Sequence, residues 1–420
     1  ENRAALDFIR WLTIDKGFEL AASMSYMPVD HNGMTEEQEQ QIDDIHAHGY
    51  LLRHNKSGAR VLLLETEDDN KVFNIAFRTP PSDSTGVAHI LEHSVLCGSR
   101  EFPLKDPFVE LVKGSLNTFL NAMTYPDKTM YPVASTNDAD FQNLMHVYMD
   151  AVFYPNIYKH DEIFRQEGWS YHLESEDGPL TYNGVVYNEM KGAFSSADDV
   201  LERETFNTLF PDTPYGVESG GDPSCIPNLT YENFLKFHQT YYHPSNSYIY
   251  LYGDMDMTEK LRWLDEEYLG KYDRKEIDSE IQIQKKFKEP IEREIFYSVS
   301  ESESLDHATY LSINTQAGNE LSQKEYVAFQ ILEYVLLDAP GAPLKKALLD
   351  AGIGDDIMGG YEYGILQPYF SVIAKNAERE QKDEFVKIVK AELKKLADGG
   401  IDKKCLKAGI NNYEFQYREA

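Results

Sequence analysis

The stretch GVAHILEHSVLC, residues 86–97, carries two histidines and a glutamate within five positions. Its apolar residues have helical spacing, the preceding PPSDST supplies a breaker and several N-cap candidates, and Gly98 can end the helix. We therefore predict a buried helix here. Because residues four apart on an α-helix lie only about 40° apart around its axis, His89 and His93 project from one face.

Two histidines on one helix face can bind a single zinc ion. Zinc accepts neutral histidine nitrogens, and a catalytic zinc site adds a further protein ligand while keeping one position for water. Glu92 directly precedes the second histidine and is suited to take a proton from that water rather than to bind the metal. HxxEH is also the inverted form of the zinc-protease signature HExxH. The plain alternative is a helix that carries these three residues by chance.

Composition indicates a globular protein with a strongly negative field. The 420 residues suit two domains, and 42% of them are hydrophobic. Lys+Arg number 40 against 71 Asp+Glu, which gives a formal charge of −31. Such a field repels nucleic acid and anionic lipid, so we expect neither nucleic acid nor membrane as a partner, and it attracts basic peptides. The acidity could also serve solubility alone.

The cysteines and the apolar segments bear on the compartment. Cys97, Cys225 and Cys405 are odd in number and far apart, so we expect neither a disulfide framework nor a thiolate metal cluster, and a reducing compartment. No stretch approaches the roughly 20 apolar residues of a membrane span. The residues after Glu1 lack the pattern of a signal peptide, so we expect no export.

Strands and helices alternate in both halves of the chain. Two apolar runs at 59–66 and 72–79, separated by EDDNK, predict an antiparallel strand pair. Further predictions in the first half are an extended segment at 118–135, a helix at 138–153, a helical region from about Gly184 to Phe210, and a strand at 245–254. The second half repeats the alternation with strands at 308–316 and 364–375 and helices at 325–337 and 382–398.

This alternation predicts an α+β fold of two related domains. We expect an N-terminal extension at 1–45, a zinc-binding catalytic domain at 46–270, a densely charged connector at 271–294 and a second domain without the zinc motif at 295–420. Met34 could be a native start, so we interpret residues 1–33 as foreign to the rest of the chain. From the residues alone, the third metal ligand remains open among Glu174, Glu189, Glu202 and Glu204.

Three longer motifs point to a known family. GVAHILEHSVLCGS, DPFVELVKGSLNTFLNAMTYPDKTMYPVAS and GVVYNEMKGAF together resemble the presequence-protease branch of the pitrilysin (inverzincin) metallopeptidases. The resemblance extends from about Gly49 to the end of the chain. It implies two related pitrilysin-type α/β roll domains, each a mainly antiparallel sheet packed by helices. It also selects Glu189, in VVYNEMKGA, as the third ligand beside His89 and His93, with one zinc per chain and Glu92 as the catalytic base.

The resemblance further implies where the substrate lies. NAMTY, residues 121–125, resembles the edge strand along which the family's substrates bind, which assigns Asn121, Ala122, Met123 and Thr124 to peptide binding by strand addition. An ordinary strand that leads into a turn is the alternative. Tyr187 and Asn188 flank Glu189 and are candidates for orienting it, although the sequence does not show this.

The expected function is zinc-dependent cleavage of short unfolded peptides, including basic targeting-type peptides. The family's proteases are longer and consist of two halves, so we expect a C-terminal half of the same protease as a partner that is needed for full activity. A non-catalytic peptide-binding or assembly subunit of the same fold is one alternative. A structural zinc protein is another, but it would usually need a fourth protein ligand. We expect a bacterial cytoplasm, with the mitochondrial or plastid matrix as the alternative.

Overall fold

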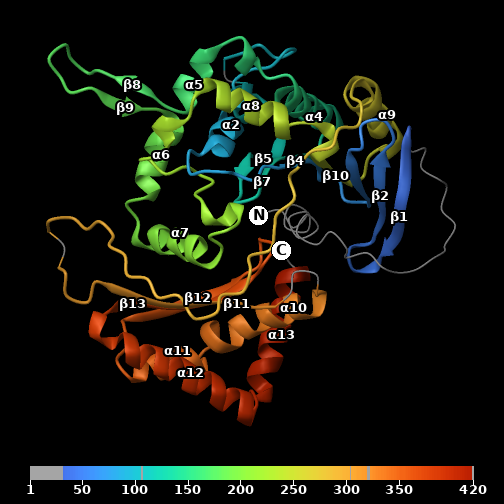
Figure 1. Ribbon diagram of the computed structural model, residues 1–420. Coiled ribbons are helices and arrows are strands. Elements are labelled where there is room, and N and C mark those ends of the chain that lie inside the picture. Colours follow the sequence, from blue (N-terminus) through green and yellow to red (C-terminus); the bar gives the residue numbers. More distant parts are fainter. Residues whose placement is uncertain (1–31, 106, 303, 319–321, 419–420) are drawn as a thin grey trace. The chain divides into compact units, whose positions relative to one another are not determined.

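The computed structural model describes residues 32–105, 107–302, 304–318 and 322–418 (Figure 1). The interpretation of residues 1–33 as foreign therefore falls almost wholly outside the described residues. Contacts divide the chain into two compact units, here named the N-terminal unit (within 18–282) and the C-terminal unit (within 283–420). The division falls inside the charged segment 271–294. In the described residues, no helix has the length and apolar character needed to cross a bilayer.

The N-terminal unit is built on an eight-stranded sheet of order β1-β2-β3-β10-β4-β7-β5, with β6 also paired to β7. Neighbouring strands are antiparallel except β10 and β3, which are parallel. β4, β7 and β10 are buried along nearly their whole length, so they form the centre of the core. The strands are β1 (Met34–Ile42), β2 (Ala47–His54), β3 (Arg60–Glu65), β4 (Lys71–Arg78), β5 (Asn117–Leu120), β6 (Met123–Thr124), β7 (Lys128–Ser135) and β10 (Ser247–Gly253).

The predicted pairing of the runs at 59–66 and 72–79 is wrong. Both runs are strands and they are antiparallel to each other, but β10 lies between them. It pairs Tyr248 with Arg60 of β3 in parallel register and Ser247 with Phe77 of β4 in antiparallel register. Because β3 and β4 are buried, their backbone N–H and C=O groups need partners on both sides. Their local pattern cannot show that a strand far along the chain fills the place between them.

The expected N-terminal extension also needs correction in its last part. Residues 34–42 form β1, which pairs antiparallel with β2 from Met34 opposite His54 to Ile42 opposite Ala47. Most side chains of β1 are exposed, and its sequence MTEEQEQQI has no apolar alternation. Backbone hydrogen bonding at the end of a sheet needs no apolar face, so the strand left no signal in the pattern. This segment belongs to the N-terminal unit.

Helices cover the sheet and carry the candidate site. The predicted helix at 138–153 is confirmed as α4, and the region predicted from Gly184 to Phe210 is two helices separated by a short break. Ser196 ends that break by capping the second helix through a hydrogen bond from the Asp199 backbone N–H. The helices of this unit are α2 (Val87–Val95), α3 (Pro107–Gly114), α4 (Asp138–Phe153), α5 (Asp161–Glu167), α6 (Val185–Ala193), α7 (Ala197–Leu209), α8 (Tyr231–Tyr241) and α9 (Met257–Glu267).

A two-stranded hairpin, β8 (Ser170–His172) and β9 (Thr181–Asn183), lies between α5 and α6 in sequence and is not part of the large sheet. Figure 1 shows it extending away from the remainder of the N-terminal unit beside α5 and α6. Its position matters because α6 begins two residues after β9 and carries one of the candidate ligands.

The C-terminal unit has a smaller core of its own. Its sheet has the order β11-β13-β12 and is antiparallel throughout. Apolar residues such as Leu344, Ile357 and Phe385 are fully buried between sheet and helices. The α+β class is thereby confirmed. The elements are β11 (Thr309–Gln316), α10 (Gln323–Glu333) with a π-helical turn at Tyr334–Asp338, α11 (Pro343–Asp350), β12 (Asp356–Glu362), β13 (Tyr369–Ala377), α12 (Lys382–Gly399) and α13 (Lys403–Arg418).

Candidate metal centre

Helix α2 is held tightly at its start by a close backbone contact. Gly86, its N-cap, has φ +69°, and a Cβ atom there would lie 2.7 Å from the carbonyl oxygen of Gly220. Only glycine allows this approach. The loop that contains Gly220 is itself tied down, because the Gly220 N–H donates to Glu218 Oε1 at 3.0 Å. The loop therefore meets α2 in a fixed position.

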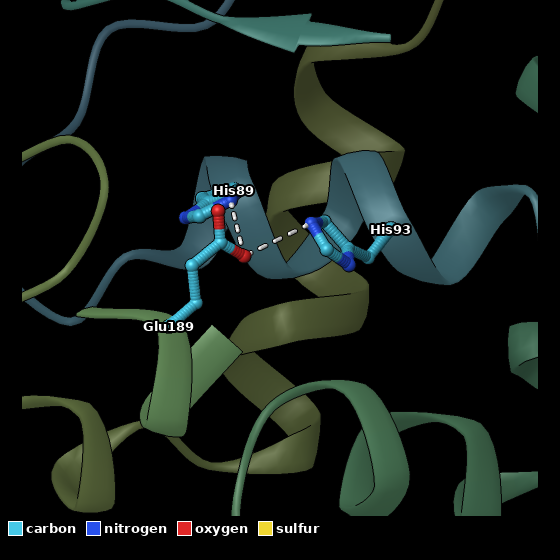
Figure 2. A group of neighbouring side chains, drawn as sticks. All are labelled: His89, His93 and Glu189. Atoms are coloured by element: carbon cyan, nitrogen blue, oxygen red, sulfur yellow. Dashed lines mark ion pairs between the residues drawn. The ribbon is translucent and has the colours of Figure 1, made fainter. Parts of the chain in front are cut away.

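The three predicted metal ligands lie together. Glu189 Oε2 is 3.8 Å from His89 Nε2 and 3.7 Å from His93 Nε2. Figure 2 shows both imidazoles on one side of α2, turned toward the carboxylate that α6 brings to them. Of the groups formed by described histidines, cysteines and acidic residues, this is the one whose three ligand atoms lie within 4.8 Å of one another. Glu174, Glu202 and Glu204 are not part of it.

The outer nitrogen of each imidazole has a partner that orients the ring. His89 Nδ1 lies 3.0 Å from the carbonyl oxygen of Gly220 and donates to it. His93 Nδ1 lies 3.3 Å from Glu167 Oε2, at the end of α5. A proton on each Nδ1 leaves each Nε2 as a lone-pair donor toward Glu189, which is the tautomer a metal-binding histidine requires.

In the pair formed by His93 and Glu167, burial and the interactions between the two side chains shift each pKa in opposite directions. Burial lowers the pKa of His93, but the hydrogen bond to Glu167 and the nearby carboxylate charges outweigh it, so the pKa is raised. For Glu167 the directions are reversed. Burial alone would raise its pKa, but hydrogen bonds from His93 and Gln166 lower the pKa by more, so it lies below its usual value. The hydrogen bond between His93 and Glu167 thus favours the charged form of each of these two side chains.

The donor set fits zinc. Two imidazole nitrogens and one carboxylate oxygen are the ligands of several catalytic zinc sites, whose tetrahedral geometry places ligand atoms roughly 3.3 Å apart. The observed separations of 3.7 and 3.8 Å need only small side-chain movements to reach that spacing. The Glu189 side chain is 56% exposed, against 12% for His89 and 26% for His93. One side of the group is therefore open to solvent, as a catalytic site requires.

Glu92 occupies a different environment from the three ligands. It lies on the same helix but is buried, and its Oε2 accepts a hydrogen bond of 2.6 Å from Thr124 Oγ1. Thr124 belongs to β6, so the carboxylate is connected directly to the end of the sheet. The charge of Glu92 acts on the buried phenols of Tyr131 and Tyr148, whose pKa values are raised first by burial and also by this charge. Both phenols therefore stay protonated.

The four predicted substrate residues lie at the end of the large sheet beside this carboxylate. In the part of the chain that the structure describes, β5 and β6 pair with β7 alone, so their outer side has no neighbouring strand. The predicted continuous strand is interrupted, because Asn121 and Ala122 lie between β5 and β6, where Ala122 N–H bonds to Asn121 Oδ1 at 3.0 Å. The Asn121 carbonyl accepts from Tyr148 Oη at 3.2 Å.

Sequence reasoning missed the groups that orient the ligands. Neither Glu167 nor the Gly220 carbonyl was a candidate, since one is an ordinary helix glutamate and the other a backbone atom. The suggested residues beside Glu189 do other things. Asn188 Nδ2 donates to Asn183 Oδ1 at 2.7 Å, and the Tyr187 ring packs 5.9 Å from that of Tyr182.

A Ser–His–Asp arrangement elsewhere has no access to a substrate. His54 Nδ1 lies 2.7 Å from Ser57 Oγ and its Nε2 lies 2.9 Å from Asp265 Oδ1, which resembles the contacts of a hydrolytic triad. Ser57 is 0% and His54 1% exposed, however, so a peptide cannot reach the hydroxyl. The group connects the turn after β2 to α9 and is structural.

A mainly antiparallel sheet that supports an HxxEH helix beside a third carboxylate is the arrangement of the inverzincin class of peptidases. Comparison with family models agrees with this class. Residues 77–179 match the model described as insulinase (peptidase family M16), and residues 228–413 match the one described as peptidase M16 inactive domain. The chain belongs to the pitrilysin family of peptidases, M16, and is presequence-protease-like.

Curated relatives support this assignment. The chain is 55% identical over 378 residues to a protein named HypA from Clostridium perfringens, a match that covers 90% of this chain and 39% of the relative. It is 44% identical over 391 residues to presequence protease 1, chloroplastic/mitochondrial, from Arabidopsis thaliana, covering 92% of this chain and 36% of the relative. The chain thus spans less than half the length of these relatives.

Solved structures show the same fold. The crystal structure of pitrilysin superposes with a TM-score of 0.63 at 18% identity, covering 92% of this chain and 40% of that one. A protease from Helicobacter pylori gives the same TM-score at 20% identity, covering 86% of this chain and 83% of that one. At these identities the likeness concerns the fold alone.

Proposed function

We propose that this chain is the catalytic N-terminal half of a zinc-dependent endopeptidase that degrades short unfolded peptides, including basic targeting-type peptides. The observation that carries the proposal is the convergence of His89, His93 and Glu189, with the outer nitrogen of each imidazole next to an acceptor, the Gly220 carbonyl for His89 and Glu167 for His93. These three residues would hold the ion. When bound, zinc supplies Lewis-acid polarisation of a carbonyl group and lowers the pKa of water.

Glu92 is the proton carrier in this proposal. Its carboxylate is buried next to the ligands without belonging to them, and Thr124 holds one of its oxygens by a 2.6 Å hydrogen bond. The other oxygen can take a proton from the attacking water and later return it to the leaving amine. Because the Thr124 bond fixes the carboxylate beside β6, the proton moves next to the strand where the peptide lies.

The substrate would bind by extending the sheet. An extended peptide alongside β5 and β6 exchanges backbone hydrogen bonds with the sheet end, and such bonds do not depend on the peptide's side chains. Asn121 to Thr124 would position the bond to be cleaved, with the Tyr148 hydroxyl fixing the Asn121 carbonyl. Binding of this kind requires an unfolded peptide, which fits degradation rather than processing of folded proteins.

The strong negative charge supports basic peptides as substrates. At −31, the chain attracts cationic ligands over distances up to about a Debye length, roughly 8–10 Å in physiological salt. Because the curated relatives are more than twice as long, we also propose a C-terminal half of the same protease as the partner that completes the site. The setting would be a bacterial cytoplasm or, alternatively, the mitochondrial or plastid matrix.

Glu92→Gln tests the proposal. Because Glu92 carries protons and does not bind the metal, the variant should retain zinc and peptide binding while cleaving an unstructured basic peptide about 10²–10⁴ times more slowly. Glu110→Gln, an exposed glutamate on α3, is the control and should cleave like the parent. Both are assayed with and without the separately prepared C-terminal half. If the parent binds peptide but cleaves no faster than Glu92→Gln under either condition, the chain is a non-catalytic peptide-binding subunit.

A further inference from the structure

The β8–β9 hairpin exposes an apolar face. Cross-strand partners in an antiparallel pair point to the same side, and sides alternate along each strand. Tyr171 pairs with Tyr182. Leu173 directly follows β8 and Leu180 directly precedes β9, so both continue the alternation on the side of the tyrosines. These side chains are 62%, 41%, 50% and 61% exposed, respectively. The other face carries the polar pairs Ser170 with Asn183 and His172 with Thr181.

This face differs from the scattered apolar residues of an ordinary surface. Contiguous apolar side chains that are exposed to solvent cost free energy, and such patches usually mark a binding surface. The rings also form a continuous series. Trp169 lies 5.6 Å from Tyr171, Tyr171 lies 5.5 Å from Tyr182, and Tyr182 lies 5.9 Å from Tyr187. Since Tyr187 is on α6, the series leads from the hairpin to the helix that carries Glu189.

The base of the hairpin is fixed to the body of the N-terminal unit. A Cβ atom at Gly184 would lie 2.1 Å from the Gly168 carbonyl oxygen, so the two ends of the hairpin approach as closely as only glycine permits. Trp169 Nε1 donates to the Leu229 carbonyl at 3.0 Å, which ties the first strand to the body of the unit. A ligand on the hairpin is therefore held at a set position relative to α6.

The turn of the hairpin is acidic. Glu174, Glu176 and Asp177 are all exposed, and the segment 168–183 contains no lysine or arginine. An apolar face next to three carboxylates is complementary to a peptide segment that has apolar residues on one side and basic residues beside them. Such a segment would bury its apolar side on the tyrosines and leucines while its cations approach the turn.

We propose that the apolar face of the β8–β9 hairpin, with its acidic turn, is an exosite for a basic amphipathic segment of the peptide, outside the bond that is cleaved. The inference rests on the proposed function, because it names how that site would select its substrates. A segment held on the hairpin raises the effective concentration of the rest of the same peptide at β5 and β6. Peptides without a basic amphipathic segment gain nothing from the hairpin.

Binding is measured on the Glu92→Gln chain, which should not consume the peptide. The probes are a fluorescent basic amphipathic peptide of about 20 residues, a scrambled peptide of the same composition, and a six-residue peptide too short to span both surfaces. The apolar variant replaces Tyr171, Leu173 and Leu180 by serine, with Leu349, Met358 and Leu393 replaced by serine as its control. The charge variant is Glu174→Gln, Glu176→Gln and Asp177→Asn, with Glu276→Gln, Asp278→Asn and Glu280→Gln as its control.

The apolar variant should weaken binding of the amphipathic peptide about tenfold or more, while the six-residue peptide binds as before. The charge variant should weaken binding of the amphipathic peptide several-fold at low salt and remove much of the salt dependence of that binding. Equal affinities of hairpin and control variants for the amphipathic peptide would overturn the exosite, as would an equal loss of affinity for the scrambled peptide in the apolar variant. Should the hairpin substitutions instead abolish dimers of the chain in sedimentation without changing peptide affinity, the face binds a second copy and the proposal is wrong.

Zinc content and cleavage of the six-residue peptide by the chain with Glu92 intact separate this inference from the proposed function. Those measurements depend on the metal ligands and on Glu92 and not on the hairpin. A hairpin variant that binds zinc and cleaves the short peptide normally but has lost the amphipathic peptide supports the exosite. Circular dichroism of each variant confirms that the fold is retained.

Discussion

Replacing Glu167 by glutamine tests how much the outer hydrogen bond of His93 contributes to zinc affinity. The substitution keeps the shape of the side chain and removes its charge. Hydrogen bonds to a charged partner contribute about 1.5–3 kcal/mol. The His93 Nδ1 to Glu167 Oε2 distance of 3.3 Å is longer than the usual 2.9–3.0 Å or so, and the His93 side chain is 26% exposed, so the lower end applies. A loss of about 1.5 kcal/mol corresponds to roughly tenfold weaker zinc binding.

Zinc affinity is measured by competition with a chromophoric chelator of known affinity at fixed pH. Glu162→Gln, on the exposed face of the same helix α5, is the control and should leave the affinity unchanged. The expected tenfold loss falls at the low end of what the removal of such outer partners costs at zinc sites. If Glu167→Gln binds zinc within twofold of the parent, the contribution of the Glu167 charge to zinc binding is refuted, because the glutamine still offers an oxygen to His93 but no charge.

Two further predictions concern stability. Burial lowers the pKa of His238 from 6.5 to about 4, so between these values the unfolded chain binds a proton that the folded chain does not. This destabilises the fold by about 3 kcal/mol as pH falls from 6.5 to 4. In His238→Gln, the free energy of unfolding measured with urea should depend less on pH over this range. An unchanged pH dependence contradicts the lowered pKa of His238. Gly184→Ala should destabilise the fold by about 3 kcal/mol or more because of the 2.1 Å approach to the Gly168 oxygen, whereas Gly192→Ala, inside the helix α6 that follows, meets nothing within 4 Å and should not. Equal thermal midpoints for the two would refute the close contact.

The spacing of apolar residues predicted the helices that are determined by neighbouring residues in the sequence. The helix at 138–153 was found at its full extent because its periodicity coincides with a cap, in which Asn137 accepts from the Asp140 backbone N–H. The HxxEH helix was found from its periodicity without a side-chain cap, since its apolar residues face the core while His89 and His93 share one side. In both cases the spacing of residues within a few turns is sufficient to predict the helix.

Contacts between distant segments could not be predicted in this way. The position of β10 between β3 and β4 depends on a strand far along the chain, and no local pattern records it. Glu189 could be preferred over Glu174, Glu202 and Glu204 only through the family motif, since all are glutamates in polar surroundings. The Gly220 carbonyl group that orients His89 belongs to the backbone, so the sequence cannot identify it. Gly86, which permits its close approach, is the one related residue.

The zinc content of the purified chain tests the central claim most directly. A three-ligand site made by His89, His93 and Glu189 predicts about one zinc per chain by elemental analysis. The double variant His89→Ala and His93→Ala should lose that zinc, whereas the control His160→Ala and His172→Ala, in which both histidines are exposed, should retain it. Zinc that is undiminished in the first variant, or absent from the parent after incubation with the metal, would contradict the assigned site.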